Sequence, residues 1–152
     1  MRVPAYHRGY VVDASVAAKW FVQRGDADRE RALSIRERFM AGQCRLIMPE
    51  FGLLEIANAI RYTPRAKEAD AAAALDVLRD LNLELHQTSW DLLRKVNAIA
   101  WAYGIAVYDA IYVALAEIVG FPLVTANEAL VRDMKGHSIV LRLRDLEVGE
   151  RR

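Results

Sequence analysis

Three acidic residues of this chain occupy apolar surroundings, where a charge is costly. Asp13 follows two valines, Glu55 lies beside an apolar helical stripe, and Asp109 precedes a long apolar run. Charged side chains are seldom fully buried unless they are paired or bind a metal. Carboxylates that meet in one place cannot all stay ionised without a cation. Oxygen ligands with no nearby histidine or cysteine select Mg²⁺ or Mn²⁺, ions that support water attack on a phosphodiester.

Each acid also has an ordinary structural interpretation. Asp13 can be a turn residue or a helix cap, and Asp109 can cap a buried helix at its positive end. Glu55 can be an exposed acid on a helix whose core face is Leu53, Leu54, Ala57 and Ile60. The prediction of a site therefore depends on the three acids together.

Short strand patterns alternate with helical patterns along the chain. Strands are predicted over residues 10–13, 45–48, 83–86, 122–125 and 138–143. Helices are predicted over residues 15–22, from 26 or 28 to 40, 50–62, 65–81, from 88 or 89 to 103, 110–119 and 127–134. The alanine-rich helix is expected to turn Ala69, Ala72, Leu75 (or Ala73) and Leu78 inward. This alternation predicts an α/β fold with a parallel sheet covered on both faces.

The predicted strand ends bring several polar residues to one edge of the sheet. Asp13 ends the first strand, Ser15 is expected to cap the helix after it, and Asn127 follows the strand that ends at Thr125. Ligands of open parallel sheets bind at the carboxyl edge of the strands. We therefore expect a ligand site there.

The composition fits one globular domain over residues 1–152, with a polar tail from about residue 144. Basic and acidic residues nearly balance, 21 against 20, so a nucleic-acid partner would need a local basic face. The single cysteine, Cys44, excludes an internal disulfide and suits a reducing compartment. The histidines have no zinc spacing, and no apolar run resembles a signal peptide or a membrane span. We expect a soluble cytoplasmic protein.

Four blocks of the sequence, in this order, resemble the PIN-domain family, and most closely its VapC-type toxin ribonucleases. The blocks are residues 11–16, 49–59, 107–116 and 123–127. The resemblance implies a three-layer α/β/α sandwich with a central, mainly parallel sheet. It also implies a Mg²⁺- or Mn²⁺-dependent endoribonuclease that cleaves structured RNA such as tRNA or ribosomal RNA. VapC-type toxins usually form homodimers, and a VapB-type antitoxin blocks their site.

The resemblance also assigns residues. Asp13, Glu55 and Asp109 match the catalytic acids of the metal site, and Ser15 and Thr125 match hydroxyls that line it. Asn127 stands where many relatives carry an aspartate. An amide oxygen can bind Mg²⁺ or a metal-bound water but adds no charge, so a second ion should bind more weakly. Asn127 can equally be a helix N-cap.

The substrate phosphates require basic side chains near the site. Candidates are Arg24, Arg61, Arg65, Lys67 and Arg132, any of which can instead belong to a solvated basic face. Two other functions stay open. One is a non-catalytic PIN module, which Asn127 would suit. The other is phosphoryl transfer of the haloacid-dehalogenase or receiver type, for which Lys135 is the only late lysine.

Overall fold

The fold is built around one parallel sheet. The structure is a computed structural model that describes residues 8–22 and 27–146. Five strands pair in the order β3-β2-β1-β4-β5, and every pair is parallel. The strands are β1 (Gly9–Val12), β2 (Arg45–Pro49), β3 (Glu84–His86), β4 (Leu123–Thr125) and β5 (Val140–Arg142). The predicted α/β class and parallel sheet are confirmed.

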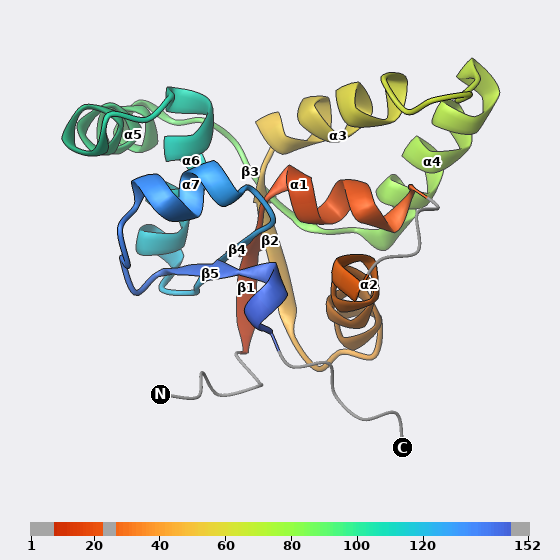
Figure 1. Cartoon of the computed structure of the whole chain (residues 1–152), viewed down its shortest axis with the longest axis horizontal. Coiled ribbons are helices and arrows are strands. Elements are labelled where there is room, and N and C mark those ends of the chain that lie inside the picture. The colour runs from red at the N-terminus through yellow and green to blue at the C-terminus, as the bar shows by residue number, and fades with distance from the viewer. Residues whose placement is uncertain (1–7, 23–26, 147–152) are drawn as a thin grey trace.

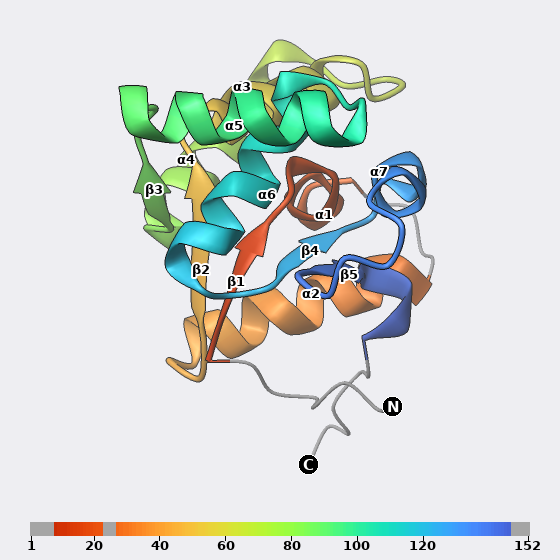
Figure 2. The same cartoon turned by 90° about the vertical axis from the view of Figure 1, so that its left-hand side faces the viewer.

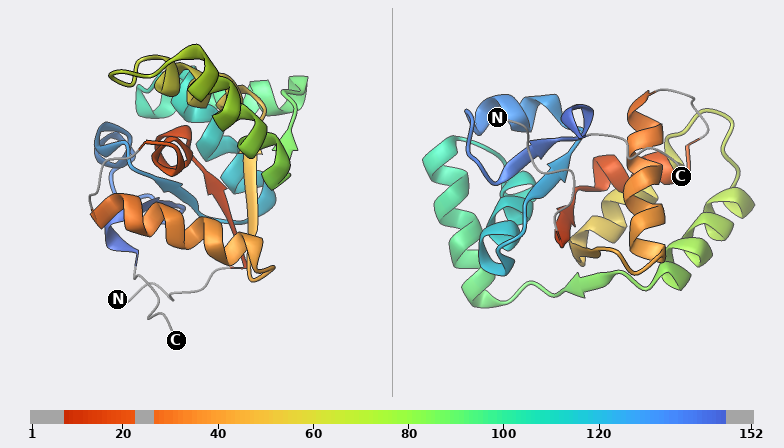
Figure 3. Two further views of the ribbon diagram at one scale, coloured as in Figure 1. Left: turned by 90° about the vertical axis from the view of Figure 1, so that its right-hand side faces the viewer. Right: turned by 90° about the horizontal axis from the view of Figure 1, so that it is seen from below.

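Helices cover both faces of this sheet and complete the three-layer sandwich. They are α1 (Ala14–Ala17), the 3-10 turn η1 (Ala18–Trp20), α2 (Ala27–Met40), α3 (Phe51–Arg61), α4 (Glu68–Leu81), α5 (Trp90–Tyr103), α6 (Val107–Val119), α7 (Glu128–Asp133) and the 3-10 turn η2 (Leu143–Asp145). In Figure 1, α5 and α6 lie on one side of the sheet, and α1, α2 and α4 lie on the other. Figures 2 and 3 show α6 against one face of β1 and β2 and α2 behind the other.

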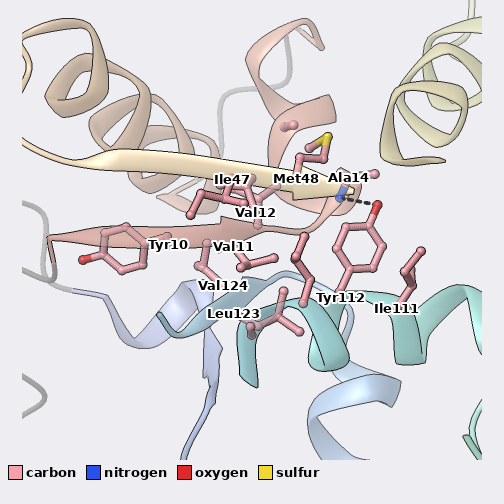
Figure 4. Packing of buried hydrophobic residues seen from close by; sticks show 14 of the residues in the cluster. Tyr10, Val11, Val12, Ala14, Ile47, Met48, Ile111, Tyr112, Leu123 and Val124 are labelled. Atoms are coloured by element: carbon pink, nitrogen blue, oxygen red, sulfur yellow. Dashed lines mark hydrogen bonds between the residues drawn. The ribbon is translucent and has the colours of Figure 1, made fainter. Parts of the chain in front are cut away.

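The core lies between β1 and α6. All of β1 is buried, and so is every residue of α6 from 110 to 116. Figure 4 shows this packing, with Tyr112 of α6 reaching the turn after β1. Burying each such aliphatic side chain stabilises the fold by roughly 1.5–3 kcal/mol. The buried helix predicted to follow Asp109 is therefore confirmed.

The first helix differs from its prediction. Helix α1 begins at Ala14, its N-cap is Asp13 in an extended conformation (φ −69°, ψ 144°), and a 3-10 turn takes over at Ala18. The prediction that Ser15 caps this helix is wrong, because its hydroxyl lies inside the first turn and donates to the Asp13 carboxylate. Trp20 is buried in the core, where its indole N–H donates to the Ala32 carbonyl at 2.9 Å.

Two predicted helix faces are only partly right, since Ile60 of α3 and Leu78 of α4 are buried as predicted but several other residues are not. In α3 the buried residues are Gly52, Ile56 and Ile60, whereas Leu54 is 68% exposed. The helix packs through its glycine, which an apolar pattern cannot reveal. In α4 only Leu78 is buried, and the partly buried Ala71 and Ala74 replace the predicted Ala69, Ala72 and Leu75. Alanines give a weak periodic signal because they are small on every face.

Several helix ends match the sequence. Ser89 caps α5 by accepting the Leu92 amide, and Asn127 caps α7 by accepting the Leu130 amide. Gly104 and Gly120 end α5 and α6 in left-handed conformations, as helix C-termini favour. Asp26 and the part of the predicted tail from residue 147 on lie outside the described residues.

No single helix in residues 8–22 and 27–146 is long and apolar enough to cross a membrane. Helices α5 and α6 reach the required length and composition only as a pair bent by 115°.

Candidate active site

Asp13 is a buried carboxylate at the carboxyl edge of the sheet. Strands β1 and β4 are in register there, since Val12 pairs with Val124 and the Asp13 amide donates to the Val124 carbonyl at 3.1 Å. The next residue of β4 is Thr125, which is fully buried. Asp13 itself is 5% exposed. The parallel register therefore brings a carboxylate and a hydroxyl from distant parts of the chain into contact.

Two hydroxyls hold the Asp13 carboxylate. Thr125 Oγ1 donates to Asp13 Oδ2 at 2.6 Å, and Ser15 Oγ donates to the same oxygen at 2.8 Å. Each hydroxyl accepts a backbone amide in turn, Thr125 from Asn127 at 3.0 Å and Ser15 from Ala126 at 3.0 Å. Since each hydroxyl oxygen receives an amide proton, its own proton points to the carboxylate. Neither hydroxyl uses the other carboxylate oxygen, Oδ1.

Burial and hydrogen bonding act on Asp13 in opposite directions. Burial raises the pKa of its carboxyl above the ordinary value, because the charged form loses its hydration. The hydrogen bonds from Thr125 and Ser15 favour the charged form and oppose that rise. Burial is the larger effect. A cation at this edge would remove the cost that the hydrogen bonds leave.

Glu55 lies half-buried on α3, close enough to Asp13 and Asp109 for their charges to affect its pKa. Its Oε1 accepts a hydrogen bond of 2.6 Å from the hydroxyl of Tyr112. Burial raises the pKa of Glu55, the hydrogen bond from Tyr112 lowers it, and the charges of Asp13 and Asp109 raise it further. Glu55 is therefore neither on the solvent side of α3 nor isolated from the other two acids.

Asp109 lies in the first turn of α6 and completes the group of three acids. Burial raises the pKa of its carboxyl, and the charge of Asp13 adds to that rise. Within residues 8–22 and 27–146, no lysine or arginine forms an ion pair with any of the three acids. The fold therefore brings three like charges into mutual range with no basic partner to balance them.

This donor set fits a hard cation, although it does not form a closed cage. In the described part of the chain, no three Asp, Glu, His or Cys side chains converge closely enough to surround an ion. Mg²⁺ usually keeps several waters and takes only one or two carboxylates directly. Three half-buried or buried carboxylates that repel one another suit such partly hydrated binding.

Comparison with known proteins identifies the family. The family model described as PIN domain matches residues 10–134, which include all three acids. The chain belongs to the PIN-domain family. Ribonuclease VapC3 of Pyrobaculum aerophilum is 32% identical over 125 residues, covering 79% of this chain and 90% of that protein. The resemblance to the VapC-type branch is thus confirmed.

Solved structures share the same fold. The crystal structure of PAE2754 from Pyrobaculum aerophilum superposes with a TM-score of 0.62 at 25% identity, covering 94% of this chain and 93% of that one. A toxin–antitoxin complex from Klebsiella pneumoniae contains a chain with a TM-score of 0.65 at 18% identity, covering 88% of this chain and 97% of that one. At that identity the second likeness shows the fold alone.

The amide at the fourth position of this PIN domain has a structural partner. Asn127 Oδ1 accepts the Leu130 amide at 3.2 Å, so the N-cap interpretation is confirmed. The charge of Asp133 at the end of α7 also raises the pKa of Asp109, less than burial and the charge of Asp13 do. Sequence reasoning missed Asp133, because it lies at the end of a short helix next to Arg132 and has the pattern of an ordinary surface acid.

Sequence reasoning also missed Tyr112 as part of the site. The available signal was its spacing, since residues three apart on a helix lie on one face and Tyr112 follows Asp109 by three. The hydroxyl contact to Glu55 depends on how α3 crosses α6, which no local pattern predicts.

The candidate RNA-binding residues do not form one surface. Arg61, Arg65 and Lys67 are exposed at the turn between α3 and α4, whereas Arg132 is exposed on α7 and pairs with Asp133 at 3.5 Å. Figure 1 places α7 and that turn on different sides of α1. Arg24 lies outside the described residues. The lysine that phosphoryl transfer would need, Lys135, is exposed in the turn after α7.

Proposed function

We propose that this PIN domain is a Mg²⁺- or Mn²⁺-dependent endoribonuclease, the toxin of a VapBC-type pair, that cleaves structured RNA such as tRNA or ribosomal RNA. One observation carries the proposal. Burial raises the pKa of Asp13, Glu55 and Asp109, and the charge of Asp13 raises the pKa of Glu55 and of Asp109 further. Carboxyls with a raised pKa near the ligand edge of a parallel sheet are typical of catalytic sites.

The three acids would hold the cation, directly or through water. When bound, the cation activates water and neutralises charge on the scissile phosphate. Ser15 and Thr125 keep Asp13 in one orientation through their paired hydrogen bonds. Asn127 contributes through its backbone amide, which holds Thr125, and through its cap of α7. With its side-chain oxygen used in the cap, Asn127 gives the site an uncharged fourth position.

The basic turn between α3 and α4 is the better candidate for phosphate binding. Arg61, Arg65 and Lys67 are exposed there on the helix that carries Glu55 or just after it. Phosphate contacts of this kind are sequence-independent and weaken as salt rises. Arg132 is a weaker candidate because its guanidinium pairs with Asp133, and Arg24 stays a prediction.

A VapB-type antitoxin and a second copy of the chain are the proposed partners. The toxin–antitoxin complex with the same fold supports the first. Exposed aromatic residues support both, because Trp90 is 78% and Trp101 83% exposed on α5, and interfaces are rich in aromatic side chains. The single free thiol of Cys44, which is buried, suits the reducing cytoplasm.

The test is cleavage of a folded RNA by the purified chain, with Mg²⁺ and after EDTA treatment. Asp109→Asn removes a charge from the first turn of α6, and we expect cleavage to fall at least about a hundredfold, since metal-based charge stabilisation contributes several kcal/mol. The matched control is Asp91→Asn in the first turn of α5, where Asp91 is exposed and 3.9 Å from Arg94. Full activity of Asp109→Asn, or equal activity in EDTA, would refute the proposal.

A non-catalytic PIN module is the second candidate. The observation in its favour is Asn127, which brings no fourth charge and uses its oxygen in a helix cap. Calorimetric titration with Mn²⁺ separates the two functions. No binding at millimolar Mn²⁺ would favour the non-catalytic module, whereas binding that Asp109→Asn weakens would favour the nuclease.

A further inference from the structure

The hydroxyl of Tyr112 lies where the three acid-bearing segments meet. Tyr112 is 1% exposed on α6, one turn after Asp109. Its hydroxyl donates to Glu55 Oε1 on α3 at 2.6 Å and accepts the amide of Ala14, the residue after Asp13, at 3.4 Å. Figure 4 shows the second of these bonds as a dashed line at the end of β1. One oxygen atom thus connects α3, α6 and the turn that carries Asp13.

Both of its partners need this contact. The Ala14 amide belongs to the first turn of α1, where backbone donors have no partner within the helix. In the described part of the chain, the Tyr112 hydroxyl is the one hydrogen-bond donor to the Glu55 carboxylate. A half-buried glutamate without a fixed donor would occupy several rotamers, because its side chain has three rotatable bonds.

The absence of a side chain at position 52 makes the contact possible. A Cβ atom on Gly52 would lie 2.9 Å from the Tyr112 hydroxyl oxygen and 2.7 Å from the Met48 side chain. The glycine therefore lets α3 approach α6 and β2 one turn before Glu55. This close approach is independent of the hydrogen bonds, and it sets the hydroxyl against the same helix that carries the acid.

We propose that Tyr112 is a positioning residue of the metal site, which holds Glu55 and the Asp13 turn in the geometry that a divalent cation requires. The inference rests on the proposed function and adds to it a residue that touches neither cation nor RNA. Groups that orient metal ligands from behind typically change metal affinity 10–100-fold when they are removed. The aromatic ring fills the core, so removal of the hydroxyl alone separates orientation from packing.

The experiment compares Tyr112→Phe with Tyr10→Phe in the full chain. Tyr10 is an equally buried tyrosine at the other end of β1, and its hydroxyl accepts from Arg38 at 3.5 Å. We measure Mn²⁺ affinity by calorimetry on metal-free protein. Tyr112→Phe should bind Mn²⁺ about tenfold more weakly than the wild type, and Tyr10→Phe should bind it equally well. Raising Mn²⁺ should restore most RNA cleavage by Tyr112→Phe, which metal could not do for a misfolded protein.

A second variant covers the case in which Tyr112→Phe does not fold. Gly52→Ala keeps the tyrosine but pushes on its hydroxyl, and it should also weaken Mn²⁺ binding. Wild-type affinity in the folded Tyr112→Phe variant, or in Gly52→Ala where that variant replaces it, would overturn the inference and leave the proposed function intact. A wild-type chain that binds no Mn²⁺ would instead overturn the proposed function, and the inference with it.

Discussion

The two ends of the same sheet shift the pKa of their acids in opposite directions. At the amino end, Arg45 of β2 and Glu84 of β3 form a forked ion pair with N–O distances from 2.7 to 3.1 Å, and Arg45 lowers the pKa of Glu84. At the carboxyl end, burial raises the pKa of Asp13, Glu55 and Asp109, and neighbouring acids raise the pKa of Glu55 and Asp109 further. At the amino end, the acid forms an ion pair with a basic residue. At the carboxyl end, the three acids have no basic partner among the described residues.

The ion pair of Arg45 and Glu84 stabilises the fold, whereas the three acids at the carboxyl end destabilise it when they are charged. A single basic residue at the carboxyl end would reduce the repulsion among these acids, as Arg45 neutralises Glu84 at the amino end. Unfavourable arrangements of this kind persist mainly at functional sites. This imbalance supports the proposal that the carboxyl end of the sheet carries the catalytic site.

The largest expected effect is on Asp13. Asp13→Asn keeps the shape of the side chain but removes the charge that a cation would need. RNA cleavage should fall at least about a hundredfold, while the free energy of unfolding of the metal-free protein should not decrease. Gel-based cleavage and urea unfolding measure the two quantities. Retained cleavage, or collapse of the fold, would remove the distinction between the two ends.

Substitution of Thr125 should reduce both stability and cleavage, because Thr125 is part of the core and also orients the Asp13 carboxylate. Thr125→Val leaves the Asn127 amide and the Asp13 carboxylate without their shared hydroxyl in a fully buried place. We expect a loss of about 1–3 kcal/mol in unfolding free energy, together with reduced cleavage. Thr63→Val is the control, since its hydroxyl serves only the exposed Ala59 carbonyl, and it should change stability by less than about 0.5 kcal/mol. Equal effects of the two variants would contradict the account.

The pH dependence should also differ between the ends. A carboxyl whose pKa is raised by folding stabilises the fold below its unfolded pKa, near 3.8 for Asp13, and loses that contribution as pH rises through the folded pKa. The metal-free wild type should therefore lose more stability on this rise than Asp13→Asn does. Glu84 has the opposite sign, because its lowered pKa stabilises the fold above the unfolded value and is lost as pH falls. Thermal melts from pH 3 to pH 8 compare the variants, and parallel curves for wild type and Asp13→Asn would contradict the assignment.

The smallest effect is expected at the amino end. Glu84→Gln breaks the ion pair with Arg45. The Glu84 side chain is 39% exposed and the Arg45 side chain 56% exposed. Exposed pairs contribute less than about 1 kcal/mol, and the pair is at the opposite end of the sheet from the acids. The free energy of unfolding should decrease slightly, and RNA cleavage should stay at the wild-type rate. A strong loss of cleavage would show that the two ends are not separate.

The sequence predicted most of the fold because its signals are local. Each strand of buried β-branched or aliphatic residues stops at a polar residue or a proline, and glycine or asparagine marks several helix ends. The register that joins Asp13 to Thr125 follows from two strand ends in a parallel sheet. The errors arose where small residues set the packing, as at Gly52 in α3 and along the alanines of α4.

The candidate site was less predictable than the fold. The three acids could be named from their apolar surroundings, but the part played by Tyr112 and Asp133 depends on the approach of separate helices. The family resemblance assigns Ser15 to the site, but the sequence pattern predicts that its hydroxyl caps a helix, whereas the hydroxyl donates to the carboxylate two residues earlier. A local pattern cannot choose between two such nearby acceptors.

The most direct test is anomalous diffraction at the manganese edge from crystals grown or soaked with Mn²⁺. We expect a peak among the side chains of Asp13, Glu55 and Asp109, at the carboxyl end of the sheet, and no peak there in Asp13→Asn. A well-diffracting crystal with no peak at those residues, or with Mn²⁺ bound only elsewhere on the chain, would contradict the claim that these acids form a cation site.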